Sequence, residues 1–193
     1  MERRTKVIAI ANQKGGVGKT TTVVNLAAAL SARKRTVLVV DLDPQAHATL
    51  GLGLEKQQGV SLYPVLLGEK PIEDVIQPTK WNNLNVIPSE VDLAGAELEL
   101  VDIPERQTRL KKALADVNEN YDYILLDCPP SLGLITLNAL TASDSFLVPI
   151  QCEYYALEGL SQLLNTVKTI KRLYNPSIDL EGVVLTMFDN RLN

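Results

Sequence analysis

Cysteine and histidine are scarce in this sequence, with two cysteines and one histidine among 193 residues. Cys128 and Cys152 lie far apart and match no metal-ligand spacing, so they indicate neither a zinc site nor a disulfide framework. No apolar run approaches the ~20 residues that a membrane-spanning helix needs. Residues 1–11 also lack the long apolar segment of a secretory signal. We therefore expect a reduced protein of the cytoplasm.

An excess of positive charge is also missing, because the net charge is −4 and the isoelectric point is near 5.1. This balance excludes a constitutively basic nucleic-acid coat, so any binding to DNA must use a local basic patch. Hydrophobic residues make up 46% of the chain, which is enough for one domain with a substantial core. Residues 1–193 are accordingly expected to form a single domain.

Short apolar runs alternate with longer helical patterns along the chain. Nearly continuous apolar runs are typical of parallel strands that are covered on both faces. The alternation predicts an α/β fold with a doubly wound, mostly parallel sheet and helices on both faces. Residues 43–83 are less regular, and we expect a long excursion there with a short helix near 61–67. The expected strands are 6–11, 36–40, 84–87, 123–126, 145–150 and 182–186, and the expected helices are 20–32, 91–100, 108–117, 134–142 and 156–173.

The stretch NQKGGVGKTTT, between the first expected strand and the first expected helix, is the most informative part of the sequence. The general phosphate-loop pattern is G-x-x-x-x-G-K-[ST] in this structural context. Gly18, Lys19 and Thr20 fill its second half, whereas Gln13 stands where the first glycine belongs. The alternative is a glycine-rich turn without a ligand. Strand, loop and helix in register favour a phosphate loop of a P-loop NTPase fold.

The chemistry of such a loop assigns a task to most of its residues. Glycines let consecutive backbone N–H groups turn towards phosphate, and the helix N-terminus adds its dipole. Lys19 can reach the β- and γ-phosphates, the Thr20 hydroxyl can bind Mg²⁺, and Thr21 can reach the α-phosphate side. The expected nucleotide-binding residues are Gly15, Gly16, Val17, Gly18, Lys19, Thr20 and Thr21.

Lys14 is a second lysine in the same loop, and it need not touch the phosphates bound by its own chain. The Lys14 side chain can instead enter the site of a facing subunit and place its positive charge where the γ-phosphate leaves. An arginine finger has this role in other NTPases. A solvated surface lysine is the alternative, and spacing alone leaves it open.

Three aspartates follow strands at the edge where ligands of such sheets bind. Asp41 and Asp43 point the same way if strand geometry persists to residue 43. Asp127 ends the expected strand 123–126 in a Walker B arrangement and is expected to hold Mg²⁺ through water. The alternatives are an Asp-Pro turn at Asp43 and a capping role for Asp127.

These motifs resemble those of the MinD/ParA ATPases. K-G-G-V-G-K-T-T resembles their deviant Walker A motif, D-L-D-P-Q their first switch, and D-C-P-P-S-L-G their second. The stretches VPIQCEYYALEGLSQLLNTV and LTMFDNRLN resemble the ParA or Soj branch of chromosome and plasmid partitioning proteins. Family members continue beyond the position of Asn193 with a further strand and helices, so the sequence looks C-terminally short.

The resemblance implies a function. Mg²⁺ and ATP would drive a sandwich homodimer in which Lys14 reaches the partner's nucleotide. Asp41 would support the Mg²⁺ shell and Asp43 would orient the attacking water, with slow intrinsic hydrolysis. The dimer would bind double-stranded DNA nonspecifically on the nucleoid, and a ParB-type centromere-binding protein would stimulate turnover. The candidate DNA-binding residues are Arg191, Lys171 and Arg172.

Three other functions stay open at this stage. A MinD-like ATPase that positions on a membrane surface would need an amphipathic helix, which residues 1–193 do not show. A metabolic P-loop enzyme, such as an ATP-dependent amide ligase, would need its own substrate pocket. A degenerate fragment would bind nucleotide without hydrolysing it. Replacement of Lys14 is the discriminating test, because turnover per subunit that is unchanged and independent of protein concentration would contradict a lysine that acts across the dimer.

Overall fold

One mostly parallel sheet organises the computed structural model, which describes residues 5–152 and 156–188, the side chains of 156–158 aside. Its strand order is β3-β4-β2-β5-β1-β6-β7. Every neighbouring pair is parallel except β3 with β4. The doubly wound α/β prediction is therefore confirmed. The strands are β1 (Lys6–Ile10), β2 (Val37–Asp41), β3 (Gln77–Pro78), β4 (Leu84–Ile87), β5 (Tyr123–Asp127), β6 (Ser145–Gln151) and β7 (Asp179–Thr186).

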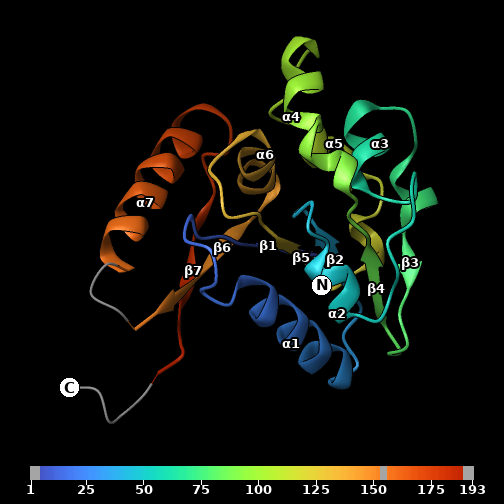
Figure 1. The fold of residues 1–193 in the computed structure, drawn as a ribbon, viewed down its shortest axis with the longest axis horizontal. Helices are drawn as coiled ribbons and strands as arrows, with labels where there is room; N and C mark the ends of the chain where they lie inside the picture. Colours follow the sequence, from blue (N-terminus) through green and yellow to red (C-terminus); the bar gives the residue numbers. More distant parts are fainter. Residues whose placement is uncertain (1–4, 153–155, 189–193) are drawn as a thin grey trace.

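Helices cover both faces of this sheet (Figure 1). Because side chains alternate along a strand, Ile8 and Ile10 of β1 pack towards the N-terminal helices, whereas Val7 and Ala9 belong to the core of the opposite face. The helices are α1 (Lys19–Ala32) and α2 (His47–Gly51) on the first face, and α3 (Leu62–Leu67), α4 (Ala96–Glu99), α5 (Arg109–Ala115), α6 (Leu134–Ala142) and α7 (Ala156–Leu173) on the other. Over the two described stretches, no helix has the length and apolar character to span a membrane.

Two local predictions need correction. The single helix expected over 91–100 is instead a 3-10 turn (Val91–Ala94), the short α4 and a second 3-10 turn (Leu100–Asp102). Gly95 lies at the first break, where its N–H bonds the carbonyl of Asp92, and glycine is a poor residue for a helix interior. Within 43–83 the expected short helix is confirmed as α3, but α2 and the edge strand β3 were not predicted.

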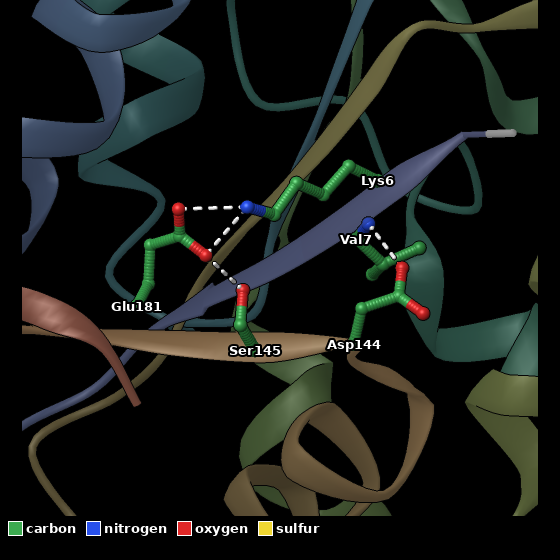
Figure 2. A network of polar contacts seen from close by, with 5 residues as sticks. All are labelled: Lys6, Val7, Asp144, Ser145 and Glu181. Atoms are coloured by element: carbon green, nitrogen blue, oxygen red, sulfur yellow. Dashed lines mark hydrogen bonds and ion pairs between the residues drawn. The ribbon is translucent and has the colours of Figure 1, made fainter. Parts of the chain in front are cut away.

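The open edge of the sheet is tied to its centre at the amino end of the strands (Figure 2). The Lys6 ammonium of β1 pairs with Glu181 of β7, with its Nζ 2.6 Å from Oε2. The Ser145 hydroxyl of β6 donates to the same oxygen at 2.7 Å. Beside this pair, the Val7 N–H of β1 donates at 2.9 Å to the carboxylate of Asp144, the residue before β6. The edge strand β7 is therefore fixed against β1 and β6 where it begins.

The central strands bring their carboxyl ends together. Asp127 of β5 lies in register with Asp41 of β2 on one side and with Ile10 of β1 on the other. The loops that follow β1, β2 and β5 consequently meet at one edge, which is where parallel α/β sheets bind ligands.

Replacing Asn138 with alanine is expected to lower the free energy of unfolding by about 2–3 kcal/mol, because it leaves buried groups without partners. The buried Asn138 amide of α6 donates to the carbonyls of Arg106 and Leu134 at 2.7 and 3.0 Å. Its Oδ1 accepts from the Leu110 N–H of α5 at 3.2 Å. Urea unfolding measures the change, and Asn165→Ala on the exposed side of α7 is the matched control. Equal stability of the two variants would contradict this prediction.

Candidate functional site

The loop between β1 and α1 has the backbone of an anion site. Gly16 and Gly18 adopt left-handed φ angles of 72° and 89°, which glycine tolerates without a steric cost. Gly18 is the N-cap of α1 and supplies no side chain to satisfy the first N–H groups of the helix. A helix N-terminus of this kind favours a phosphate group by its free donors and its dipole. The local conformation thus agrees with the expected phosphate loop.

Asn12 holds this loop against the neighbouring strand. Its buried amide donates to the carbonyl of Pro149 in β6 at 2.7 Å, and its Oδ1 accepts from the Lys14 N–H at 3.0 Å. No local sequence pattern indicates this role of Asn12, because its partner lies 137 positions away.

Lys19 lies in the middle of the site and is 7% exposed. Its Nζ donates to the Lys14 carbonyl at 3.1 Å, so the side chain curls back over the loop. Burial lowers the pKa of Lys19, and the negative charge of Asp127 acts in the opposite direction. A buried ammonium with few fixed bonds is well placed to pair with a phosphate chain.

Asp127 presents a buried carboxylate at the end of β5. Among the described residues, neither of its oxygens has a well-directed hydrogen bond, although the Thr20 hydroxyl is near enough to favour the charged form. Burial, followed by the charge of Asp41, raises the pKa of Asp127 to about 7. Such a group fits a magnesium ion and its water shell.

The side chains that the structure describes do not complete a metal site by themselves. Within the part of the chain that the structure describes, no group of three or more His, Cys, Asp or Glu side chains is arranged to hold a metal ion. A magnesium ion beside Asp127 and Thr20 would therefore need phosphate oxygens and water for its remaining positions, which is its usual mode of binding in nucleotide sites.

Asp41 is engaged by α2. Its Oδ2 accepts from the Thr49 N–H at 2.8 Å and from the Thr49 hydroxyl at 2.7 Å, and its Oδ1 accepts from the Asp43 N–H at 3.2 Å. Burial raises the pKa of Asp41, and the bonds from Thr49 partly counteract that rise. Asp41 thus fastens α2 to the end of β2, a link that the sequence did not reveal. Its support of the magnesium shell stays a prediction.

Asp43 lies in a turn beyond the end of β2. The strand ends at Asp41, so the period-two argument does not extend to residue 43. The Oδ1 of Asp43 accepts from the Gln45 N–H at 2.9 Å, as expected for the Asp-Pro turn. Its charge nevertheless acts on Lys19, Asp41 and Asp127, which places the carboxylate among the other groups of the site.

Cys128 is a packed thiol. The residue is fully buried behind Asp127, and burial raises the pKa of its thiol. Cys152, at the end of β6, is exposed.

We expect a thiol reagent to label the native protein at Cys152 only, and at both cysteines once the chain is unfolded. The reagent cannot reach Cys128 in the native protein, because this residue is buried in the core. Mass spectrometry of the intact protein and its peptides gives the count and the position, and Cys152→Ser is the control. Rapid native labelling of Cys128 would contradict its burial.

Lys171 and Arg172, two of the candidate DNA-binding residues, lie apart from these groups. Lys171 and Arg172 are exposed at the end of α7, and Lys171 pairs loosely with Asp179 at 3.9 Å. Asp179 begins β7, so this pair lies at the amino edge of the sheet, opposite the phosphate loop. Arg191 lies outside the described residues. Lys14 is half-buried in the loop, and its action on a second subunit stays a prediction.

Comparison with known proteins identifies close relatives. Residues 5–180 match the family described as "AAA domain". The sporulation initiation inhibitor protein Soj of Bacillus subtilis is 58% identical over 97% of this chain and 75% of its own length. The chromosome partitioning protein ParA of Myxococcus xanthus is 54% identical over 97% of this chain and 67% of its own length.

Solved structures show the same fold. A Mycobacterium smegmatis protein described as cobyrinic acid a,c-diamide synthase, with a bound ATP analogue and magnesium, has a TM-score of 0.93 and 44% identity over 97% of this chain and 77% of that one. A plasmid partition protein from Borrelia burgdorferi has a TM-score of 0.86 and 31% identity over 97% of this chain and 80% of that one.

Proposed function

Because the chain belongs to the AAA-domain family and, within it, to the Soj/ParA partitioning ATPases, we propose that it is an ATP-driven switch for DNA partitioning. The observation that carries the proposal is the convergence of the phosphate loop with Lys19, Asp43 and Asp127 at one edge of the sheet. This constellation suits transfer of a phosphoryl group to water.

ATP is the proposed substrate, and Mg²⁺ is the proposed cofactor. The Mycobacterium smegmatis relative binds an ATP analogue with magnesium, which supports both. The loop N–H groups and Lys19 would hold the phosphates, while the Thr20 hydroxyl and Asp127, through water, would hold the ion. Magnesium would neutralise charge that develops on the phosphates.

Hydrolysis needs a water molecule in line with the γ-phosphate and a positive charge at that phosphate. Asp43 is the candidate for orienting the water, because its N–H bonds Asp41, its charge acts on Lys19 and Asp127, and its side chain remains partly accessible. Lys14 of a second copy is the candidate for the positive charge, so that an ATP-bound homodimer is the active form. Slow hydrolysis suits a protein whose product is a change of conformation.

The proposed readout of the switch is binding to double-stranded DNA without sequence preference. Lys171, Arg172 and Arg191 would contribute phosphate contacts, and the paired surfaces of a dimer would double their number. A ParB-type partner, which binds centromere-like DNA, would stimulate hydrolysis and release the dimer. The names of the Bacillus and Myxococcus relatives support this role.

Retardation of a random-sequence duplex at low salt tests the proposal, with Asp43→Ala used to hold the ATP state. Low salt matters because phosphate contacts weaken steeply as the salt concentration rises. We expect binding with ATP, none with ADP, and loss of binding in Arg191→Ala but not in Lys111→Ala, a control at an exposed lysine of α5. Absence of ATP-dependent binding, with nucleotide binding intact, would argue against the DNA role.

ATP-dependent amide formation is the second candidate, because the Mycobacterium smegmatis relative is described as a diamide synthase at 44% identity. Such a reaction joins ammonia to a carboxylate and releases ADP and phosphate. Incubation with ATP, glutamine or ammonia, and cobyrinic acid, followed by mass spectrometry of the acid, tests it directly. We expect an unchanged acid, and an amidated product would favour the synthase.

A further inference from the structure

The last residue of the edge strand β7 touches the phosphate loop. The Thr186 hydroxyl donates a hydrogen bond to the Val17 carbonyl at 2.8 Å, across 169 positions of sequence. Glu181 anchors the other end of β7 to Lys6 and Ser145 (Figure 2). Thr186 itself pairs with Gln151 of β6, so its position is fixed by the sheet. The loop is thus held on its outer side by a rigid element.

The Val17 carbonyl lies outside the hydrogen-bond ladder of α1. The helix begins one residue after Gly18, and its first turn uses the Gly18 carbonyl, which accepts from the Thr22 N–H at 2.9 Å and from the Thr22 hydroxyl at 2.7 Å. Val17 itself is 1% exposed, so little water reaches it. A buried carbonyl without a donor costs about 1–3 kcal/mol, and the Thr186 hydroxyl meets that need.

Planarity of the peptide bond gives this contact a consequence for the phosphate site. In a trans peptide, the carbonyl of one residue and the N–H of the next point in opposite directions. A bond that holds the Val17 carbonyl towards β7 therefore turns the Gly18 N–H away from β7, towards the inside of the loop. Gly18 has a φ of 89° and no Cβ, so the peptide on its amino side is otherwise free to rotate.

Close packing restricts the same peptide. A Cβ placed on Gly18 would lie 3.4 Å from the Thr186 methyl carbon, so the strand end and the loop are in near contact. Thr186 in turn pairs with Gln151 of β6, and its carbonyl accepts from the Cys152 N–H at 3.4 Å. Thr186 accordingly acts on the loop from a position that two strands define.

We propose that Thr186 is a positioning residue for nucleotide binding, which fixes the peptide between Val17 and Gly18 with its N–H directed at the bound phosphate chain. The inference rests on the proposed function, since it assumes that the loop binds a nucleotide. It adds a group from the far end of the chain to a site that is otherwise formed by residues near the N-terminus and by the two switch segments.

The test compares Thr186→Val, which removes the hydroxyl and keeps the shape, with Thr186→Ser, which keeps the hydroxyl. Calorimetry with magnesium and ADP, and with AMP, measures binding. We expect Thr186→Val to weaken ADP binding about tenfold, the typical size of one charge-assisted hydrogen bond. AMP binding should change much less, because AMP lacks the β-phosphate, and Thr186→Ser should bind ADP normally.

Thr22→Val is the matched control, because its hydroxyl also donates to a loop carbonyl, that of Gly18, but this carbonyl keeps its bond from the Thr22 N–H when the hydroxyl is removed. It should bind ADP normally. Equal ADP binding by Thr186→Val and the wild type would overturn this inference alone. Equal weakening of ADP and AMP binding, or a failure of Thr186→Ser to restore binding, would show a packing effect and also overturn it. A wild-type chain that binds no ADP would overturn the proposed function, and this inference with it.

Discussion

Replacement of Lys14 by alanine is expected to lower ATP turnover by about 10³-fold or more while ATP binding stays intact, because arginine fingers contribute ~10³–10⁵ to turnover. The structure separates the two tasks of this residue. Its backbone supports the loop, since the N–H donates to Asn12 and the carbonyl accepts from Lys19. Alanine keeps both of these bonds. Only the side-chain ammonium is lost, and that is the group assigned to the partner's nucleotide.

Mixing two inactive variants gives the sharpest measurement of this effect. In a mixed dimer of Lys14→Ala and Asp43→Ala, the Lys14→Ala subunit keeps its own Asp43 and receives Lys14 from the other subunit. Turnover should therefore reappear in the mixture, and wild-type turnover per subunit should rise with protein concentration. Lys111→Ala is the control for loss of a lysine elsewhere. If Lys14→Ala alone hydrolyses ATP at the wild-type rate, the transfer of this lysine between subunits is wrong.

Replacement of Asp43 by alanine is expected to have the second large effect. It should lower the rate of ATP hydrolysis by about 10²–10⁴-fold and change the ATP affinity little. Asp43 follows β2 in a turn and is only partly buried, so the fold does not depend on it. ATP should then remain bound and the dimer should accumulate. Light scattering after gel filtration, with ATP and with ADP, shows the accumulation, and phosphate release gives the rate.

Asp43→Asn makes the same test more stringent. Asparagine keeps an oxygen that can accept from the Gln45 N–H, as Oδ1 of Asp43 does at 2.9 Å, so the turn should persist without the negative charge. Asp74→Asn, at an exposed acid of the excursion, is the matched control. Near-normal hydrolysis by Asp43→Asn would show that the turn, rather than the charge, is what the site needs from this residue.

Most features that depend on short segments of the chain could be predicted from the sequence. The phosphate loop, the strand ends that carry Asp41 and Asp127, and the parallel sheet follow from motifs and apolar runs that each span about ten residues. The interpretation of Asp41 was less complete, because its bonds to Thr49 depend on how α2 folds back onto β2. The expected helix over 91–100 failed for a related reason, since its apolar spacing hid the break at Gly95.

Contacts between distant segments were not predictable in the same way. Asn12 reaches Pro149, and Thr186 reaches Val17, only because β1, β6 and β7 lie next to one another in the sheet. The order of the strands depends on the long connections between them and on the packing of helices on both faces of the sheet. No short segment of the sequence contains this information. The contacts of the Asn12 amide and the Thr186 hydroxyl at the phosphate loop could therefore not be predicted from the residues around them.

The central position of β1 has a consequence for biosynthesis. β1 is made first, yet its neighbours are β5 and β6, and roughly 120 residues separate it from β5. At about 5–20 residues per second, the ribosome needs roughly 6–24 s to supply that partner. During this interval the segment KVIAI has no strand to pair with, and the phosphate loop that follows it has no framework. The phosphate loop is thus translated before the strands that frame it, and its framework is complete only once β5 and β6 have been made.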